Sequence, residues 1–246
     1  MNEVELTISA GGRSQEPSSL RLVATLTVAG MISGLALAGV YQLTAPIIAE
    51  NDAKALRAAV YKVVPGSTQM QRLTLRDGAL MVVGEEEEVE TPVVYGAYDE
   101  SGRFVGYAIE GAGPGFQDTI KLLYGYDPAT KQVIGMEVLE SRETPGLGDK
   151  IFKDAAFRAN FTALAADPAI VVVKDGKDRA NEVDAITGAT ISSKAVVKII
   201  NAGNEAWLET LPEPGDEPGL EEKAEERETA GGAPGIPGIP LKEGDR

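Results

Sequence analysis

Uncharged, mostly apolar residues fill one long stretch near the N-terminus of the chain. No residue in the stretch 22–43 is charged. A helix of this length, at about 1.5 Å per residue, is long enough to cross the roughly 30 Å hydrocarbon core of a bilayer. We therefore predict a transmembrane helix over 22–43. Because Arg13 and Arg21 precede it, the positive-inside tendency places the segment 1–21 in the cytoplasm and the main domain outside.

A cleaved signal peptide is the alternative interpretation of this stretch. The triplet 36–38, Ala-Leu-Ala, has the small-residue spacing that signal peptidase accepts. The apolar run, however, continues to Ile47 and Ile48 and is longer than the apolar core of a signal peptide needs to be. The pattern therefore favours a retained membrane anchor.

Beyond the apolar stretch, the pattern changes to shorter runs typical of helices and strands. Helices are expected over 49–63, 149–165 and 192–208. Strands are expected over 80–83, 92–98, 103–110, 119–126, 133–139, 170–173 and 182–186. Turn sequences at 99–102 and 127–130 join neighbouring strands into hairpins. The pattern thus predicts an α+β domain over 44–210, with a mostly antiparallel sheet and flanking helices.

Two polar segments are expected to have no packed structure. Proline, glycine and glutamate dominate the C-terminal segment 211–246, where large apolar residues are few. Such a composition buries too little apolar surface to fold, so we expect a disordered acidic tail. The four consecutive glutamates at 85–88 repel one another and are expected in a solvated loop rather than at a metal site.

The composition excludes several kinds of chemistry. The chain has 246 residues and contains neither cysteine nor histidine. Their absence removes disulfides, thiolate-bound iron–sulfur clusters, the usual zinc sites and histidine-dependent acid–base catalysis. A net charge of −15 repels a phosphate backbone, so nucleic acid is not expected as a partner. Any redox chemistry must therefore come from a bound organic cofactor.

The segment 184–193 carries the strongest candidate chemistry. Its sequence, DAITGATISS, places hydroxyls and a glycine at the start of the last expected helix. Unpaired N–H groups and a partial positive charge at a helix N-terminus favour a phosphate. Gly188 lets the backbone approach a ligand closely, and Thr190 offers an oxygen that can bond to phosphorus. An ordinary helix cap by Thr190 or Ser192 is the alternative.

Two motifs resemble those of one known family. Residues 184–190 resemble the D-x-x-(S/T)-G-A-(T/S) signature of proteins that carry FMN as a phosphoester of threonine. Residues 143–148, ETPGLG, resemble a loop shared by the G subunit of the Rnf ion-translocating electron-transport complex and the C subunit of the sodium-pumping NADH:quinone oxidoreductase. Both motifs follow a single membrane helix in the expected order. The resemblance covers roughly residues 20–208 and excludes the tail.

The resemblance implies that Thr190 carries covalent FMN. A separate, magnesium-dependent flavin transferase would move FMN from FAD onto its hydroxyl, and Asp184, Gly188 and Ala189 match the part that the transferase recognises. Thr187 stands where the ion-pumping subunits commonly have serine. The N–H groups and hydroxyls at the helix start would hold the phosphate. The implied cofactor-binding residues are Thr190, Asp184, Thr187, Gly188, Ala189, Ser192, Ser193, Lys194, Glu143, Thr144, Pro145, Gly146, Leu147 and Gly148.

The ETPGLG loop would line the flavin side of this site. Its glycines allow close approach of the backbone to the ring, and Leu147 would pack on an isoalloxazine face. The resemblance assigns no catalytic and no metal-binding residue to the chain. The protein would therefore relay electrons as part of a complex and have no complete activity alone.

Taken as a whole, the resemblance implies a membrane-anchored flavoprotein subunit of an Rnf-type complex, which couples ferredoxin and NAD redox chemistry to Na⁺ or H⁺ movement. Its partners would be the other membrane and redox subunits and, during maturation, the flavin transferase. The flavin domain would lie outside a bacterial or archaeal cytoplasmic membrane. The continuation 147–151 and the compact core favour Rnf over the quinone reductase. A membrane-anchored binding or assembly protein without flavin is the alternative of another class.

Overall fold

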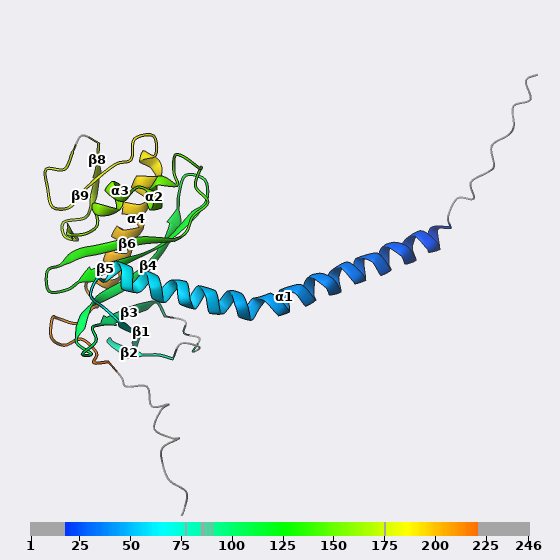
Figure 1. Cartoon of the computed structure of the whole chain (residues 1–246), viewed down its shortest axis with the longest axis horizontal. Helices are drawn as coiled ribbons and strands as arrows, with labels where there is room; N and C mark the ends of the chain where they lie inside the picture. The colour runs from blue at the N-terminus through cyan, green and yellow to red at the C-terminus, as the bar shows by residue number, and fades with distance from the viewer. Residues whose placement is uncertain are drawn as a thin grey trace, which may run out of the picture. The chain divides into compact units, whose positions relative to one another are not determined.

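The computed structural model describes residues 18–220 except 77, 85, 86, 88, 90 and 175. Three expected features therefore lie wholly or mostly outside the described residues: the cytoplasmic segment, the glutamate run 85–88 and the C-terminal tail after residue 220. The chain divides into two units, residues 1–55 and 56–246, whose elements are drawn in Figure 1.

In the first unit, the described residues form most of helix α1 (Ser19–Val63), a single helix where the sequence predicted two. Its length and its mean hydropathy of 1.9 over one window suffice for a membrane crossing. The hydroxyls of Thr25, Thr27 and Thr44 each donate to a backbone carbonyl one turn earlier. These polar groups are therefore satisfied inside the helix, as hydrocarbon surroundings require.

A seven-stranded sheet forms the centre of the second unit, with the order β2-β1-β3-β4-β5-β6-β7. All neighbouring strands are antiparallel, which confirms the predicted fold class. The strands are β1 (Gln69–Arg76), β2 (Ala79–Val82), β3 (Val93–Tyr98), β4 (Phe104–Pro114), β5 (Thr119–Asp127), β6 (Gln132–Glu140) and β7 (Leu164–Ala165). Neither β1 nor β7 has a counterpart among the expected strands.

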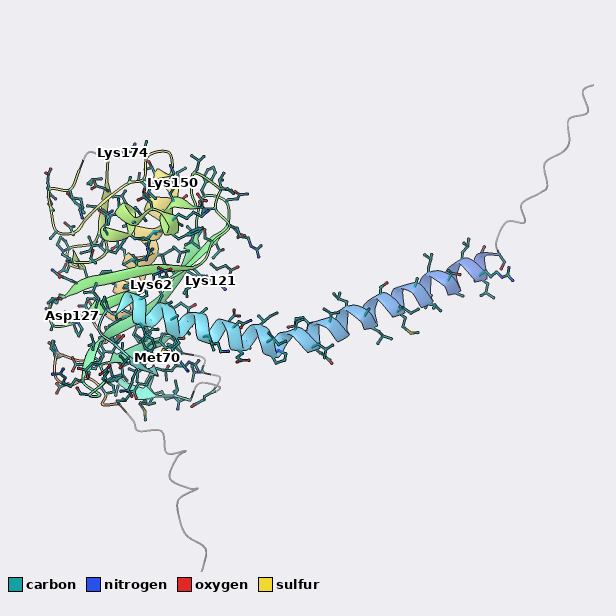
Figure 2. All side chains as sticks on the ribbon, viewed as in Figure 1. Lys62, Met70, Lys121, Asp127, Lys150 and Lys174 are labelled. Carbon is teal, nitrogen blue, oxygen red and sulfur yellow. The ribbon has the colours of Figure 1, made fainter. Side chains whose placement is uncertain are left out.

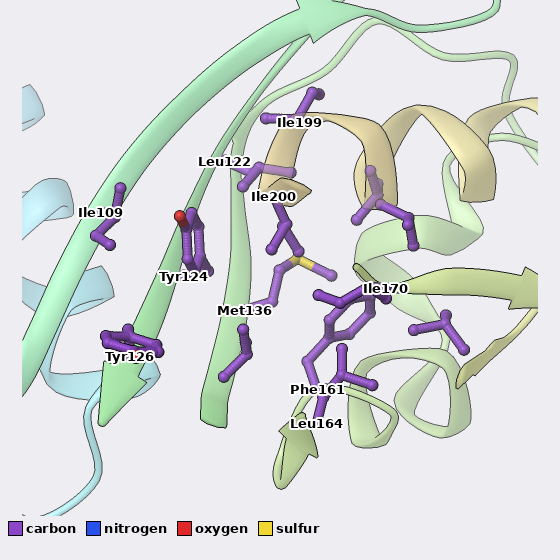
Figure 3. Packing of buried hydrophobic residues seen from close by; sticks show 14 of the residues in the cluster. Ile109, Leu122, Tyr124, Tyr126, Met136, Phe161, Leu164, Ile170, Ile199 and Ile200 are labelled. Atoms are coloured by element: carbon purple, nitrogen blue, oxygen red, sulfur yellow. The ribbon is translucent and has the colours of Figure 1, made fainter. Parts of the chain in front are cut away.

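Helices pack on both faces of this sheet. On one face, Ile200 of helix α4 (Thr190–Trp207) belongs to the same buried cluster as Tyr124 of β5, as Figure 3 shows. On the other face, Val60 near the end of α1 clusters with Leu123 of β5. Because both faces are covered, β5 is buried almost continuously instead of at alternate residues.

The end of α1 contacts bare backbone in the middle of the sheet. Gly125 of β5 and Gly135 of β6 pair across the two strands. A Cβ atom at either position would collide with the carbonyl oxygen of Val63, and at Gly135 it would lie 2.5 Å from that oxygen. Only glycine allows the helix to end this close to the strands.

The prediction of one helix over 149–165 is wrong. The segment splits into α2 (Lys150–Lys153) and α3 (Ala155–Ala159), and β7 follows. Asp154 between the helices has extended backbone with ψ of 112°, and its carboxylate accepts the N–H of Ala156 at 2.8 Å. A residue that caps the second helix in this way cannot continue the first.

Two further short strands lead the chain to the start of α4. Strands β8 (Val171–Val173) and β9 (Glu182–Asp184) confirm the expected strand positions and pair in parallel as a separate sheet. Helix α4 then begins at Thr190, two residues before the expected helix start.

The expected boundary of the disordered tail, residue 211, lies too early. The Tyr98 hydroxyl donates to the carbonyl of Pro218 at 2.6 Å, and the Gln71 amide nitrogen donates to the carbonyl of Gly219 at 2.9 Å. Residues 211–220 are thus attached to the domain. The attachment uses backbone carbonyls, which any sequence has, so composition did not indicate it.

The variant Gly135→Ala tests the contact between α1 and the sheet. The added methyl group would push the Val63 carbonyl off the strands, so we expect a loss of about 1–3 kcal/mol in the free energy of unfolding. Urea unfolding of the full-length protein in detergent, followed through Trp207, the sole tryptophan, measures the loss. Gly219→Ala is the control, because a Cβ atom there meets nothing within 4 Å. Equal stability of both variants would contradict the close approach.

Candidate functional site

Three segments from different parts of the chain meet at the N-terminal end of α4. They are the loop 115–118 between β4 and β5, the loop 141–149 after β6, and the turn 185–189 after β9. The second and third segments contain the two sequence motifs. Figure 2 shows Lys150, which directly follows the loop 141–149, at the end of the domain opposite Met70 of β1.

The buried carboxylate of Glu143 joins these segments. Its Oε1 atom accepts hydrogen bonds from the N–H groups of Phe116 and Gln117, each at 2.9 Å. Its Oε2 atom accepts the hydroxyl hydrogen of Ser192, in the first turn of α4. Glu143 as a whole residue is only 5% exposed. One buried charge therefore holds the β4–β5 loop and the start of α4 to the ETPGLG loop.

Hydrogen bonds decide the protonation state of Glu143. Burial by itself raises the pKa of a carboxyl group, because it disfavours the charged form. The hydroxyl of Ser192 and the N–H groups of residues 116–118 outweigh burial and hold the pKa of Glu143 below its ordinary value of 4.5. The side chain is therefore a carboxylate at neutral pH.

Two glycines make room for this carboxylate. A Cβ atom at Gly115 would lie 2.5 Å from Oε1 of Glu143, and one at Gly148 would lie 2.7 Å from Oε2. The sequence predicted that Gly148 lets the backbone approach a flavin ring. In the structure, its missing side chain instead gives space to Glu143 and Ser192. Gly146 is exposed, and its φ of +79° places it in the left-handed region that glycine favours in turns.

The rest of the ETPGLG loop forms a tight turn that reaches the other motif. The hydroxyl of Thr144 donates to Oε1 of Gln117 at 3.1 Å, and Pro145 is exposed. A terminal methyl of Leu147 lies 3.4 Å from the position that a Cβ atom at Gly188 would occupy. The two sequence motifs, far apart in the chain, are therefore in contact.

The turn before α4 leads into a helix start that no side chain of the described residues caps. Gly188 has φ of +84°, and Ala189 is the N-cap residue of a helix that receives no side-chain cap from the described residues. The first N–H groups of a helix have no acceptor within it and carry partial positive charge. Thr190, the first residue of α4, is half-buried, and its hydroxyl has no hydrogen-bond partner within the described part of the chain. The alternative of an ordinary cap by Thr190 or Ser192 does not hold.

The two serines after Thr190 are bonded inside the protein. Ser192 donates to Glu143, and the Ser193 hydroxyl donates to the carbonyl of Ala189 at 3.0 Å and accepts the N–H of Ile186 at 3.1 Å. These bonds fasten the turn and the helix start to each other, and they disagree with the expectation that both hydroxyls contact a phosphate. Lys194 is an exposed residue of α4, outside this network.

Two of the three segments and the first turn of α4 each expose one large apolar residue. Phe116 is 63% exposed, Leu147 48% and Ile191 57%. Outside α1, only Met81 and Val171 among the described large apolar residues are exposed as well. Exposed apolar residues gathered at one place indicate a ligand or partner surface. The sequence predicted Leu147 but not Phe116, although a phenylalanine after Gly-Pro-Gly in a short loop was a usable signal.

Asp184 and Thr187 line a separate cavity beside the turn. It has a volume of about 480 Å³, and Lys150 and Lys177 also line it. Oδ1 of Asp184 is buried and has no hydrogen-bond partner among the residues that the structure describes. Thr190 is not among the residues that line this cavity. The lining of this cavity thus includes two of the predicted site residues but not Thr190.

A family model described as an FMN-binding domain matches residues 115–205. The match begins at the β4–β5 loop and includes both sequence motifs. All three segments that meet at the start of α4 therefore lie within the matched region.

Two similar proteins cover most of the chain. The G subunit of the proton-translocating ferredoxin:NAD⁺ oxidoreductase complex of Clostridium ljungdahlii is 32% identical over 74% of this chain and 87% of that protein. The G subunit of the Na⁺-translocating complex of Acetobacterium woodii is also 32% identical, over 72% of this chain and 85% of its own length.

Among solved structures, NqrC of Shewanella oneidensis matches with a TM-score of 0.51 and 16% identity, over 62% of this chain and 91% of that chain. The C subunit of the Na⁺-translocating NADH-quinone reductase of Parabacteroides distasonis matches with a TM-score of 0.51 and 19% identity, over 65% of this chain and 92% of its own. These two likenesses show a shared fold.

The variant Glu143→Gln tests the carboxylate at the centre of the site. Hydrogen bonds to charged groups contribute more than neutral ones, so we expect the variant to lose about 2 kcal/mol of stability at pH 7. Because the pKa of Glu143 is lowered by folding, its contribution is present above the ordinary value of 4.5 and is lost as the pH falls through the folded-state pKa. Urea unfolding at several pH values should show the gap between wild type and variant closing in acid.

Glu110→Gln is the matched control, because Glu110 is exposed on β4. It should change the stability little at any pH. Ser192→Ala removes one donor to Glu143 and should weaken the same pH dependence. A gap between wild type and Glu143→Gln that stays constant down to pH 3 would contradict the role assigned to the charge.

Proposed function

The chain belongs to the family of G subunits of Rnf-type ion-translocating oxidoreductase complexes, and from this membership we propose that it is a membrane-anchored flavoprotein subunit that relays electrons within such a complex. The names of its relatives include proton-translocating and Na⁺-translocating complexes, so the proposal concerns ion translocation in general. Identities of 30–32% over 72–74% of the chain favour this assignment over a quinone reductase component, whose likeness is one of fold.

The cofactor in this proposal is FMN joined through a phosphoester to Thr190. The observation that carries it is the hydroxyl of the half-buried residue Thr190, which is unbonded within the described residues and lies at the start of α4, where no described side chain caps the helix. The N–H groups of the first helical turn would stabilise the phosphate by charge and hydrogen bonding. The match to an FMN-binding domain supports the same cofactor.

The surroundings of Thr190 fit a flavin as well as a phosphate. Leu147 and Ile191 are exposed next to the turn, and Phe116 is exposed on the loop that Glu143 holds. These side chains would offer an apolar surface to a ring system. When bound, FMN supplies transfer of electrons singly or in pairs. The chain itself would orient the ring and keep water from part of it.

Attachment requires a second protein. In the proposed step, the Thr190 oxygen forms a bond to the phosphorus of the FMN half of FAD, the phosphoanhydride bond of FAD breaks, and AMP leaves. The hydroxyl proton must pass to a base. No carboxylate in the described part of the chain is hydrogen-bonded to this hydroxyl, and the chain has no histidine. A separate flavin transferase would therefore provide the base.

Helix α1 serves as the membrane anchor in this proposal. It is long and apolar enough to cross a bilayer, and the charge bias of the sequence favours a cytoplasmic N-terminus and an outer flavin domain. The other membrane and redox subunits of the complex would be its partners. A binding or assembly protein without flavin agrees less well with the match to an FMN-binding domain.

Thr190→Val tests the covalent linkage. The full-length chain is produced together with its flavin transferase, denatured, separated by electrophoresis and viewed under ultraviolet light. The wild-type band should fluoresce and the Thr190→Val band should be dark, because valine has no oxygen to form the ester.

Thr187→Val is the matched control, three residues earlier in the same turn. It should keep at least part of the fluorescence. Fluorescence that survives in Thr190→Val would move the linkage to another residue, and a dark wild-type band would remove covalent flavin from the proposal.

The absence of cysteine allows a direct test of the orientation. Ala129→Cys places a single thiol at an exposed position in the turn between β5 and β6. A membrane-impermeant maleimide should label this thiol in spheroplasts, whereas a thiol introduced by Ser14→Cys should be labelled only after the membrane is broken. The reverse pattern would contradict the orientation, and loss of residue 14 from the mature chain would indicate a cleaved signal peptide.

A further inference from the structure

A second cavity lies near the C-terminal end of α4 and is independent of the proposed flavin site. It has a volume of about 740 Å³ and is formed by the last turns of α4, the turn 128–131, the segment 166–169 and the segment 208–214. Asn204 of α4 lies in the wall of this cavity. At about 1.5 Å per residue along the helix, it is roughly 21 Å from Thr190. The volume is in the range of sites that bind small molecules or short peptide segments.

A buried amide in the wall of this cavity has no partner in the described part of the chain. Asn204 is 7% exposed. Neither its side-chain nitrogen nor its side-chain oxygen has a hydrogen-bond partner among the described residues. Asn201, one turn earlier, is by contrast bonded at both ends of its amide, since its oxygen accepts the N–H of Ile170 and its nitrogen donates to the carbonyl of Ile170. Leaving a buried amide unsatisfied is costly, so Asn204 indicates a ligand group.

The charges around the cavity favour a cation. Four carboxylates and only one ammonium group line the cavity. Within the described part of the chain, none of these five groups takes part in an ion pair. They are Asp167, Glu205, Glu209, Glu213 and Lys131. An uneven set of like charges in a concave site attracts the opposite charge.

Two further features agree with a negative potential here. Burial raises the pKa of Tyr126, which lines the cavity, and the negative charges of Asp127 and Asp167 raise it further. The C-terminal end of α4 carries partial negative charge, and its last turn contains no basic residue. A cation placed near a helix end of this kind is stabilising.

We propose that this cavity binds an organic cation, an ammonium or guanidinium group on a partly apolar stem that also carries a carbonyl. The carboxylates would attract the charge, and Leu208 and Leu211 would contact the stem. The amide oxygen of Asn204 would accept from the cation, and its nitrogen would donate to the carbonyl. A lysine or arginine residue of another protein has this chemistry, and so does a free amino acid amide.

The test uses N-acetylarginine amide as the probe and the full-length, ¹⁵N-labelled protein in detergent. Titration should shift the side-chain amide resonances of Asn204 and saturate with a Kd of about 1 mM or lower. N-acetylglutamine amide, which is neutral, should cause no saturable shift. No saturation with the arginine probe, or equal affinity for both probes, would overturn the proposal.

Charge variants test the proposal without altering the buried Asn204. The double variant Glu205→Gln with Glu209→Gln should raise the Kd at least threefold, because it removes two of the attracting charges. Glu110→Gln, an exposed glutamate outside the cavity, should leave the Kd unchanged. Equal Kd values in the double variant and in wild type would also overturn the proposal.

A last experiment distinguishes the two sources of the cation. A photo-cross-linking amino acid replaces Glu213, at the edge of the cavity, in the assembled complex. If residue 213 cross-links to another protein of the complex and the arginine probe no longer binds, the cation is a basic side chain of a partner. Probe binding to the complex without a cross-link identifies a free small molecule. A complex that shows neither contradicts the proposal.

Discussion

The carboxylate of Glu143 is the group on which the arrangement of the site depends. A buried negative charge must be hydrogen-bonded, and here its donors come from two other segments, the loop after β4 and the first turn of α4. Satisfying one side chain therefore brings three distant pieces of chain together. Gly115 and Gly148 are part of the same constraint, because any side chain at either position would occupy the space of the carboxylate.

The sheet carries this site because helices cover both of its faces. The end of α1 contacts the paired glycines 125 and 135, while α4 packs over the opposite face and is thereby held with its N-terminus at the loops. A helix fixed along most of its length presents its first N–H groups in a constant position. In the proposed function, that rigidity would hold an electron carrier at a set distance from its partners.

Neighbouring residues in and around the two motifs serve different purposes in the structure. Ser192 and Ser193 are bonded inside the protein, and Gly148 makes room for Glu143, so these residues build the site. The hydroxyl of Thr190, unbonded among the described residues, and the exposed Leu147, Phe116 and Ile191 are the groups left to meet a ligand. A motif in the sequence does not distinguish the two roles, since both require particular residue types at fixed spacing.

The sequence by itself determined the membrane-length helix, most strands of an antiparallel α+β domain and the two motifs. It also placed Thr190 near the start of the last helix. These features follow from periodicity and from short-range spacing, which act within a few residues. Only the tertiary structure decided the break at Asp154, the contact of Glu143 with Ser192, the exposure of Phe116 and the burial of the Asn204 amide without a partner among the described residues. Each of these depends on which segments meet in space, and that is settled by packing across the whole chain rather than by any local pattern.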